Sequence, residues 1–182
     1  DAALFNINAT TGAITFKSSP NYEAPGDAGG DNVYDVIVSA TDGVNVTTNA
    51  DAITVTNVNE APTVTSAATA NFAENGSGTV YTAAATDPDA GATLTYSISG
   101  ADAALFNINA TTGAVTFKSS PNYEAPGDAG GNNIYDVNVT ASDGANSATK
   151  AVAITVRSEE RRVGEACGGA GSSRGSGTGY VN

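Results

Sequence analysis

The sequence predicts an all-β protein made of two similar units in tandem, each an antiparallel sandwich of short strands. The first observation is an internal repeat: residues 1–43 return as residues 102–144, at an offset of 101, and 37 of these 43 positions are identical. The second is the alternation of apolar and polar residues along the strand candidates, because a period of two is typical of a half-buried strand. The third is that turn residues separate the candidates at short intervals, while no segment has a convincing helical pattern.

The spacing of the repeat indicates how the chain is divided. A period near 100 residues is too long for a solenoid unit and matches a whole small domain. We expect an N-terminally truncated unit over residues 1–60, a complete unit over residues 61–156, and a non-native or disordered tail over residues 157–182. Compared with the second unit, the first lacks roughly the first 40 residues of the repeat. Because half a domain cannot bury a full core, we expect the first unit to be the less stable one.

Seven strands are expected in the second unit, with clusters of Gly, Pro, Asn and Asp between them. Residues 135–142 have the clearest pattern, because Tyr, Val, Val and Ala alternate there with Asp, Asn, Thr and Ser. The first unit has Ile37 in place of Asn138, an exchange that is cheap only where the side chain points outward. Seven short strands in about 95 residues favour an antiparallel sandwich. The expected strands are Thr63–Ser66, Thr79–Ala85, Thr93–Ser99, Leu105–Asn109, Ala114–Lys118, Tyr135–Ser142 and Ala148–Val156.

Charge and composition exclude several classes of function. The chain carries 7 Lys and Arg against 19 Asp and Glu, a net charge of −12, and it has no His. Without His there is no imidazole base, no Ser-His-Asp or Cys-His arrangement and no ordinary zinc site. The negative charge opposes binding to nucleic acid and to anionic membrane surfaces. Paired carboxylates suit glycoside hydrolysis, but the chain has no Trp for sugar stacking and no sign of an enlarged cleft, so we expect no enzymatic activity.

The tail differs in composition from the two units. Four of the seven basic residues and the only Cys, Cys167, lie after Val156. Residues 157–164 (RSEERRVG) resemble a translated sequencing adaptor, and the alternative is a flexible linker rich in Gly and Ser. We assign Cys167 no role under either interpretation. The two units are then free of Cys, which suits an extracellular bacterial protein.

The acidic residues fall in turns and loops. Loops gather at the two ends of a sandwich, so carboxylates from neighbouring units would meet at the junction with few basic residues to neutralise them. A hard divalent cation removes this conflict, and Ca²⁺ takes about 6–8 oxygen ligands. The alternative is that they are solvated turn residues, because Asp and Asn favour turns for backbone reasons alone. The residues concerned are Glu23, Asp42, Glu60, Glu74, Asp87, Asp89, Glu124 and Asp143.

The order of short motifs resembles cadherin repeats, and most closely the bacterial cadherin-like tandem repeats of large surface and secreted adhesins. Along residues 1–156 these motifs are Asn-Tyr-Glu, an Asp-Gly turn, the linker Asn57–Pro62 (NVNEAP), Ala-Glu-Asn and Asp-Pro-Asp-Ala-Gly. The resemblance implies that each unit is a seven-stranded Greek-key sandwich of the Ig-like, cadherin-like kind. It also implies that Ca²⁺ fills each junction between units, and that the protein lies outside the cell or at its surface.

The resemblance further implies a set of Ca²⁺ ligands. The family's linker motif, Asp-x-Asn-Asp-Asn-Ala-Pro, aligns Asn57 with its first Asp, Asn59 with its Asn and Glu60 with its second Asp. One residue of that motif is missing here, and Asn57 is neutral where the family has a carboxylate. Four loop residues complete the joint between the two units: Glu23, Asp87, Asp89 and Asp143. Three further residues would serve neighbouring joints: Glu74 and Glu124 downstream, and Asp42 upstream.

Two classes of function remain. The first is a Ca²⁺-stiffened repeat of a cell-surface or secreted adhesin, whose partners are neighbouring repeats and, through the longer protein, adhesins on other cells or surface glycans. The second is a sandwich module that binds carbohydrate or protein through loops that differ between repeats. The long loop (residues 18–32 and 119–133) differs at a single position, Asp31 against Asn132, which favours the first class. Attachment of the longer protein to a membrane is compatible with both classes, and nucleic acid is not an expected partner.

Overall fold

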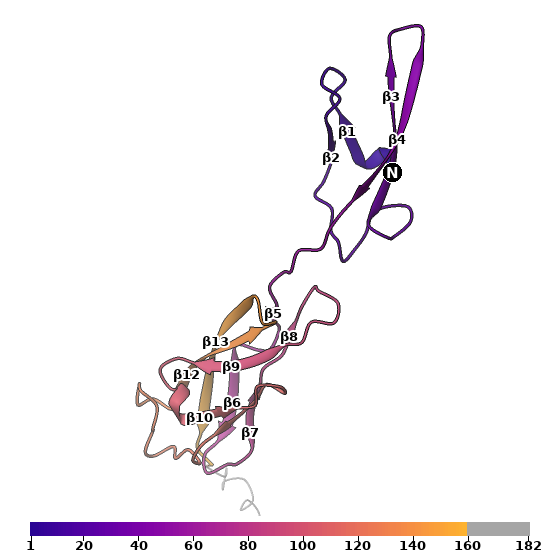
Figure 1. The fold of residues 1–182 in the computed structure, drawn as a ribbon. Helices are drawn as coiled ribbons and strands as arrows, with labels where there is room; N and C mark the ends of the chain where they lie inside the picture. The colour runs from indigo at the N-terminus through magenta and orange to yellow at the C-terminus, as the bar shows by residue number, and fades with distance from the viewer. Residues whose placement is uncertain (160–182) are drawn as a thin grey trace, which may run out of the picture.

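The computed structural model describes residues 1–159 and has two β-rich units placed end to end and joined by an extended segment (Figure 1). The regular elements in this part of the chain are strands and two 3₁₀ turns, η1 (Ala2–Leu4) and η2 (Ala103–Leu105), so the predicted all-β class is confirmed. Within residues 1–159, no helix has the length and apolarity that a membrane crossing requires. Most of the predicted tail, including Cys167, lies outside the described residues.

The larger sheet of the second unit has four strands in the order β6-β13-β12-β9. The long strands β12 (Ile134–Ser142) and β13 (Ser147–Arg157) form an antiparallel hairpin at its centre, and β9 (Thr95–Ser99) pairs antiparallel with β12. At the other edge, β6 (Thr69–Ala73) runs parallel to β13, which departs from the purely antiparallel sandwich expected from the sequence. No tight hairpin joins β6 to β13, so nothing in the connection requires an antiparallel pair.

The smaller sheet of the second unit has three antiparallel strands in the order β10-β11-β7. β10 (Phe106–Ile108) and β11 (Ala114–Phe117) form a hairpin, and β7 (Thr79–Thr82) pairs with the other side of β11. Two short strands, β5 (Thr63–Val64) and β8 (Ala85–Thr86), pair with each other next to the segment that joins the units (Figure 1). The two sheets and this short pair make up the sandwich.

The strands differ from the sequence prediction in the first third of the second unit. The predicted strand 63–66 shrinks to the two residues of β5, and β6 forms where no strand was expected. The predicted strand 79–85 is divided into β7 and β8, because the amide of Ala83 bonds to the carbonyl of Gly113 while the carbonyl of Ala84 accepts from Thr65. The chain thereby changes sheets within two residues. A short apolar run in a sequence does not reveal such a change of pairing partner.

The core of the second unit lies between its two sheets. Its fully buried aliphatic side chains are Val115, Val139, Ile154 and Val156. Beside them the ring of Phe117 lies 4.3 Å from that of Phe106 and 5.7 Å from that of Phe72, between centroids. The ring of Tyr135 stands edge-on to Phe117 at 5.0 Å, and its hydroxyl accepts a hydrogen bond from the amide of Gly127 at 3.2 Å. Tyr135 thus attaches the long loop to the core.

The long loop before β12 is a structured turn built around a buried carboxylate. Asp128 accepts hydrogen bonds from the amides of Asn132 and Asn133 at 3.0 and 2.9 Å. Asn133 has a φ of 62°, a left-handed conformation that Asn tolerates better than most residues, and its side-chain amide donates to the carbonyl of Tyr123. The first unit repeats all these contacts at the equivalent positions. The loop that carries Glu23 is therefore held in place by hydrogen bonds between its backbone and the side chains of Asp27 and Asn32.

The first unit consists of two hairpins. β1 (Phe5–Ile7) pairs with β2 (Ile14–Phe16), and β3 (Val33–Thr41) pairs with β4 (Val46–Thr54). These are the equivalents of β10-β11 and β12-β13, and the described residues contain no equivalents of β6, β7 and β9 in this unit. Ile37 is 69 % exposed, between the more buried Val36 and Val38, which confirms that this position points outward. A small core remains around Tyr34, which is only 2 % exposed.

Candidate cation site at the joint between the units

Three loops converge on the segment that joins the units. Residues 55–62 contain no strand, and both ends of the segment are attached: the amide of Val55 bonds to the carbonyl of Asn32, and Pro62 is buried. The first unit contributes the loop between β2 and β3. The second unit contributes the turns between β8 and β9 and between β12 and β13, so side chains from both units meet around the linker (Figure 1).

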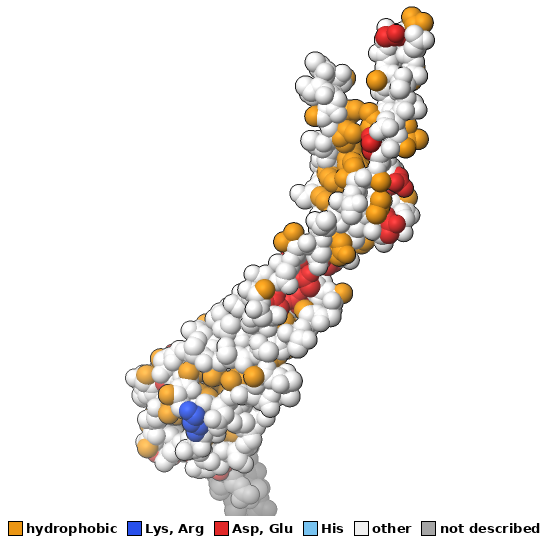
Figure 2. Space-filling view, in the orientation of Figure 1, with side chains coloured by type: hydrophobic (Ala, Val, Ile, Leu, Met, Phe, Trp, Pro, Cys, Tyr) orange, Lys and Arg blue, Asp and Glu red, His pale blue; other side chains and the backbone are white. Residues whose placement is uncertain are grey.

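Three carboxylates lie together at this joint. Glu23, Glu60 and Asp89 each place one oxygen within 4.8 Å of the others, and the first and last of them are half-buried. The sequence has no Lys or Arg between Lys17 and Lys118. On the face shown in Figure 2, acidic side chains gather at the joint without a basic one beside them. Like charges this close repel each other unless a proton or a cation intervenes.

The electrostatics of Glu60 reflect this crowding. Its pKa is raised above the ordinary value, chiefly because the carboxyl loses solvent, and further because Glu23, Asp89 and Asp87 are negatively charged. Both causes disfavour the bare carboxylate. A proton or a bound cation on Glu60 neutralises its charge and so removes the cost of placing a bare carboxylate here. The position therefore favours binding of a proton or of a cation.

Two buried carboxylate oxygens at the joint have no hydrogen-bond partner: Glu23 Oε1 and Asp87 Oδ2. The other oxygen of Asp87 accepts from the amide of Asp89 at 2.9 Å. Buried polar atoms are rarely left unsatisfied, and such atoms point to a missing water or ion. The donors gathered here are carboxylate and amide oxygens without sulfur or imidazole nitrogen, which is the set that Ca²⁺ prefers. The residues present therefore fit a calcium ion.

Two linker asparagines connect the joint to the turns of the second unit. Asn57 Nδ2 donates to Asp89 Oδ1 at 2.9 Å, and Asn59 Nδ2 donates to Asp143 Oδ2 at 2.7 Å. The amide of Glu60 donates to the other oxygen of Asp89 at 3.0 Å. The structure thus brings together all seven residues predicted for this joint. Their role as Ca²⁺ ligands remains a prediction.

Asn146 also belongs to the joint, although the sequence analysis does not single it out. Its Nδ2 donates to the carbonyls of Asn59 and Glu60 at 2.9 and 3.3 Å. Its backbone amide donates to Asp143 Oδ1, and this bond, followed by the side-chain amide of Asn59, lowers the pKa of Asp143. The available signal is the recurring Asp-Gly-x-Asn pattern, which predicts a turn but not a contact with the linker.

Asp42 lies far from this joint, in the turn between β3 and β4 at the outer end of the first unit (Figure 1). Its carboxylate accepts hydrogen bonds from the amides of Asn45 and Val44 at 2.7 and 2.9 Å. These bonds, that of Asn45 first, lower its pKa. This position agrees with the prediction that Asp42 is a Ca²⁺ ligand at an upstream joint. That role remains a prediction.

Glu74 and Glu124 lie at the end of the second unit away from the joint. Glu74 is 5 % exposed, and its carboxylate accepts from the amides of Glu159 and Tyr123 at 2.9 and 3.1 Å. These two bonds, in that order, lower its pKa. The carbonyl of Arg157 accepts from the amide of Glu74, so residues 157–159, the start of the predicted tail, contact the second unit. The predicted role of both Glu residues in a downstream joint is not tested by these contacts.

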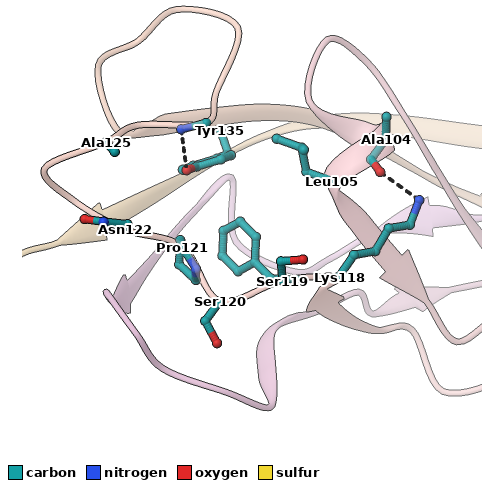
Figure 3. A pocket seen from close by; sticks show the side chains of 11 residues that line it. Ala104, Leu105, Lys118, Ser119, Ser120, Pro121, Asn122, Ala125 and Tyr135 are labelled. Atoms are coloured by element: carbon teal, nitrogen blue, oxygen red, sulfur yellow. Dashed lines mark hydrogen bonds between the residues drawn. The ribbon is translucent and has the colours of Figure 1, made fainter.

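A cavity of about 410 Å³ lies beside η2, where the end of β11 meets the long loop (Figure 3). Two of its polar groups are already engaged: Lys118 Nζ donates to the carbonyl of Ala104 at 2.7 Å, and the Tyr135 hydroxyl accepts from Gly127. It contains none of the predicted site residues. A ligand site needs several convergent polar groups that are free to bind, and this cavity offers few of them.

The comparisons with known proteins agree with this architecture. The family model described as the cadherin domain matches residues 68–157. Among solved structures, mouse cadherin-23 EC22–24 is 25 % identical with a TM-score of 0.56, and the match covers 85 % of this chain and 50 % of that one. The chain therefore spans half the length of that fragment. No curated protein matches the sequence.

Two further structures support the same fold. Human protocadherin-24 EC1–2 is 20 % identical with a TM-score of 0.61, over 87 % of this chain and 79 % of that one. Drosophila N-cadherin EC1–4 is 24 % identical with a TM-score of 0.57, over 86 % of this chain and 38 % of that one. The predicted fold class, tandem β-sandwiches of the cadherin-like kind, is thereby confirmed.

Proposed function

We propose, from the match of the cadherin-domain model to residues 68–157, that the chain is a Ca²⁺-binding piece of a tandem-repeat adhesin and that Ca²⁺ at its joint stiffens an extended array. Cadherin domains are non-enzymatic adhesion modules, and they generally bind Ca²⁺ at the linkers between domains. The finer parts of the proposal are that the ions bind at the joint described above, and that the longer protein is a bacterial surface or secreted adhesin.

The observation that carries the proposal is the composition of the joint. Glu23 comes from the first unit, Glu60 from the linker and Asp89 from the second unit, and their oxygens lie within 4.8 Å of one another. Two buried carboxylate oxygens there, one on Glu23 and one on Asp87, lack hydrogen-bond partners. A cation that binds all three segments neutralises the repulsion and connects the units at the same time.

Stiffening follows from the way these ligands are divided between the units. Without Ca²⁺, hydrogen bonds from Asn57 and Asn59 connect the linker to the second unit, while Glu23 of the first unit faces Glu60 and Asp89 across a gap of like charge. With Ca²⁺, oxygens of both units share the ions and their relative orientation becomes fixed. Ion binding then favours the extended state, because a ligand stabilises the state that it binds more tightly.

Calorimetric titration of the full chain with Ca²⁺ at low ionic strength tests the proposal. We expect saturable binding with a Kd on the order of 10⁻⁴–10⁻³ M, the range of extracellular modules. Glu60→Gln should weaken binding at least about tenfold, since affinity depends on the number of charged ligands. Asp31→Asn is the matched control, because it removes one charge and restores the residue found at the equivalent position 132. Absence of saturable heat up to tens of millimolar Ca²⁺, or equal binding of Mg²⁺, would contradict the proposal.

The proposal extends to location and partners. Neighbouring repeats of the same chain are the first partners, and adhesins on other cells or surface glycans are candidates for the longer protein. An extracellular or cell-surface location agrees with the two units being free of Cys and with the strong negative charge. The alternative, a sandwich that recognises carbohydrate or protein through its loops, is not favoured, because the long loop is nearly identical in both units and its cavity offers few free polar groups.

A further inference from the structure

Asn32 connects three segments at the end of the first unit next to the linker. It is 8 % exposed, and its side-chain Nδ2 donates a hydrogen bond to the carbonyl of Tyr22 at 3.0 Å. Its backbone carbonyl accepts from the amide of Val55 at 2.9 Å, and its own amide donates to Asp27 Oδ1 at 3.1 Å. One residue therefore ties together the segment next to Glu23, the turn at Asp27 and the start of the linker.

The bond between Val55 and Asn32 attaches the linker to the first unit. Among the hydrogen bonds described for residues 55–62, those that leave the linker from residues 57–60 reach turns of the second unit. The amide of Val55 instead reaches the carbonyl of Asn32. The position of Glu23 relative to the linker therefore depends on how the residues beside Glu23 are held at Asn32.

The second unit shows what this connection achieves. The equivalent residue, Asn133, is also 8 % exposed, donates to the carbonyl of Tyr123 at 2.9 Å and accepts from the amide of Val156 at 2.9 Å. Next to these bonds, the amides of Tyr123 and Glu159 both donate to the carboxylate of Glu74, at 3.1 and 2.9 Å. The same arrangement thus makes the loop and the segment that follows the last strand converge on one charged group.

The backbone conformation alone does not account for an asparagine at this position. Asn32 and Asn133 have φ values of 63° and 62°, in the left-handed region that Gly adopts freely. In both residues Oδ1 is buried without a hydrogen-bond partner, which costs free energy that Gly would not incur. The feature that Gly cannot supply is the Nδ2 donor, which binds the carbonyl of the loop in both units.

We propose that Asn32 is a positioning residue of the joint: its side-chain amide holds Glu23 next to the linker and thereby determines how tightly the joint binds Ca²⁺. This role rests on the proposed function. One oxygen of Glu23 lies within 4.8 Å of oxygens of Glu60 and Asp89, and these like charges repel each other. The bond from Asn32 to Tyr22 opposes that repulsion, so the ligands are already assembled before the ion binds, which favours affinity.

A purely local role of Asn32 makes a different prediction. If its side chain only stabilises the long loop, its loss should weaken Ca²⁺ binding to the same extent whether or not Glu23 is charged. If it acts through Glu23, its loss should matter only while Glu23 carries its charge, because the two substitutions then remove the same interaction. A double-mutant cycle separates the two roles.

Calcium titration of the full chain, followed at the side-chain carboxyl ¹³C signals of Glu60 and Asp89, tests the proposal. Asn32→Gly keeps the left-handed backbone and removes the Nδ2 donor. It should raise the Kd at the joint about tenfold, as the loss of groups that orient metal ligands commonly does. Asn133→Gly is the matched control, because it makes the same change in the second unit at a residue that is not attached to this linker, and it should leave that Kd unchanged.

The cycle is completed in a chain that carries Glu23→Gln. There, Asn32→Gly should change the Kd less than about twofold, since the charge that Asn32 positions is absent. Equal Kd values for the unaltered chain and Asn32→Gly would overturn the proposal, as would a loss of affinity that persists in full beside Glu23→Gln or that Asn133→Gly reproduces.

Two further outcomes are read from the same samples. Loss of the dispersed amide signals of the first unit in Asn32→Gly in EDTA would show that the side chain supports the fold and not the site, and would also overturn the proposal. An unaltered chain whose Glu60 and Asp89 signals do not respond to Ca²⁺ would contradict the proposed function itself, and with it this role. Failure of the inference alone is thus distinguishable, because the unaltered chain then binds Ca²⁺ and Asn32→Gly binds it equally well.

Discussion

At the scale of residues, the joint combines carboxyl groups whose pKa values are shifted in opposite directions. The pKa of Glu60 is raised by loss of solvent and by its acidic neighbours, and the pKa of Asp143 is lowered by hydrogen bonds from Asn146 and Asn59. A raised carboxyl pKa means that the assembled joint binds a proton more tightly than the free chain, so falling pH strengthens it. A lowered pKa has the opposite effect, and the stability it contributes is lost as pH falls through the lowered value.

These directions predict how the joint responds to pH. Without Ca²⁺, the joint should gain stability as the pH falls through the raised pKa of Glu60, and lose stability as the pH falls further through the lowered pKa of Asp143. Carboxyl ¹³C titration by NMR measures both groups, and Ca²⁺ should move the Glu60 titration to lower pH because protons and the cation compete. Asp42, whose pKa is also lowered but which lies outside the joint, is the control. A Glu60 titration that Ca²⁺ leaves unmoved would mean that this carboxyl is not a ligand.

Asp89 allows a test of binding separately from folding. Its two oxygens accept from Asn57 Nδ2 and from the amide of Glu60, so its side chain serves the linker and not the core. Asp89→Ala should weaken Ca²⁺ binding about tenfold or more while leaving the sandwich folded. Thr82→Ala, on the exposed side of β7, is the control, and thermal unfolding in EDTA compares the two. If Asp89→Ala unfolds the second unit in EDTA, its main role is to hold the turn.

At the scale of elements, the described residues contain equivalent strands in two settings. The strands of the second unit have more pairing partners than their equivalents in the first unit. β12 has β13 on one side and β9 on the other, whereas among the described residues 1–159 β3 pairs with β4 alone. Val139 on β12 is completely buried, and the equivalent Val38 on β3 is half-buried. The inward-facing residues of the two strands, Tyr, Val, Val and Ala, are the same, so the difference in burial arises from the strands that surround them.

This pair of positions predicts unequal costs for the same substitution. Val139→Ala should lower the free energy of unfolding of the second unit by about 2 kcal/mol, the transfer of two methyl groups plus a partial cavity. Val38→Ala should cost the first unit less than about 1 kcal/mol, because solvent already reaches the side chain. Denaturant unfolding followed by hydrogen exchange resolves each unit. Equal costs would mean that Val38 is buried as deeply as Val139 in solution.

At the scale of the whole molecule, the two units are connected through a joint rich in negative charge (Figure 2). The described contacts across it are hydrogen bonds of the linker to turns of the second unit, and an acidic cluster that includes Glu23 of the first. A small polar contact of this kind leaves relative motion as the default expectation. The proposed role of Ca²⁺ is to remove that motion.

Small-angle scattering tests this mechanical prediction. The suitable protein has residues 62–101 fused before Asp1, which supplies the first unit with strands equivalent to β6, β7 and β9. Millimolar Ca²⁺ should lengthen its mean dimension and narrow the range of shapes. The double variant Glu60→Gln and Asp89→Asn should need a Ca²⁺ concentration at least about tenfold higher for the same change in the scattering profile. An unchanged profile, with binding confirmed by calorimetry, would limit the ions to stabilising individual loops.

The sequence by itself determined the class of the fold, the length of the repeat and the acidic composition of the joint. Alternation along residues 135–142 was sufficient to predict β12, because one face of that strand is buried and the other is not. A difference between the two copies, Ile37 against Asn138, indicated that this position points outward, and Ile37 is 69 % exposed. The seven joint residues could be proposed from the linker motif and from turn residues, because a tandem of sandwiches places loops at its ends.

The tertiary structure alone decided which segments pair and which oxygens meet. The parallel pairing of β6 with β13, the division of residues 79–86 between two sheets and the contact of Asn146 with the linker all join residues far apart in the chain. Local patterns carry no information on such partners, because the same short apolar run or Asx turn can contact many different segments. The unpaired oxygens of Glu23 and Asp87 likewise depend on burial by neighbours that no single segment contains.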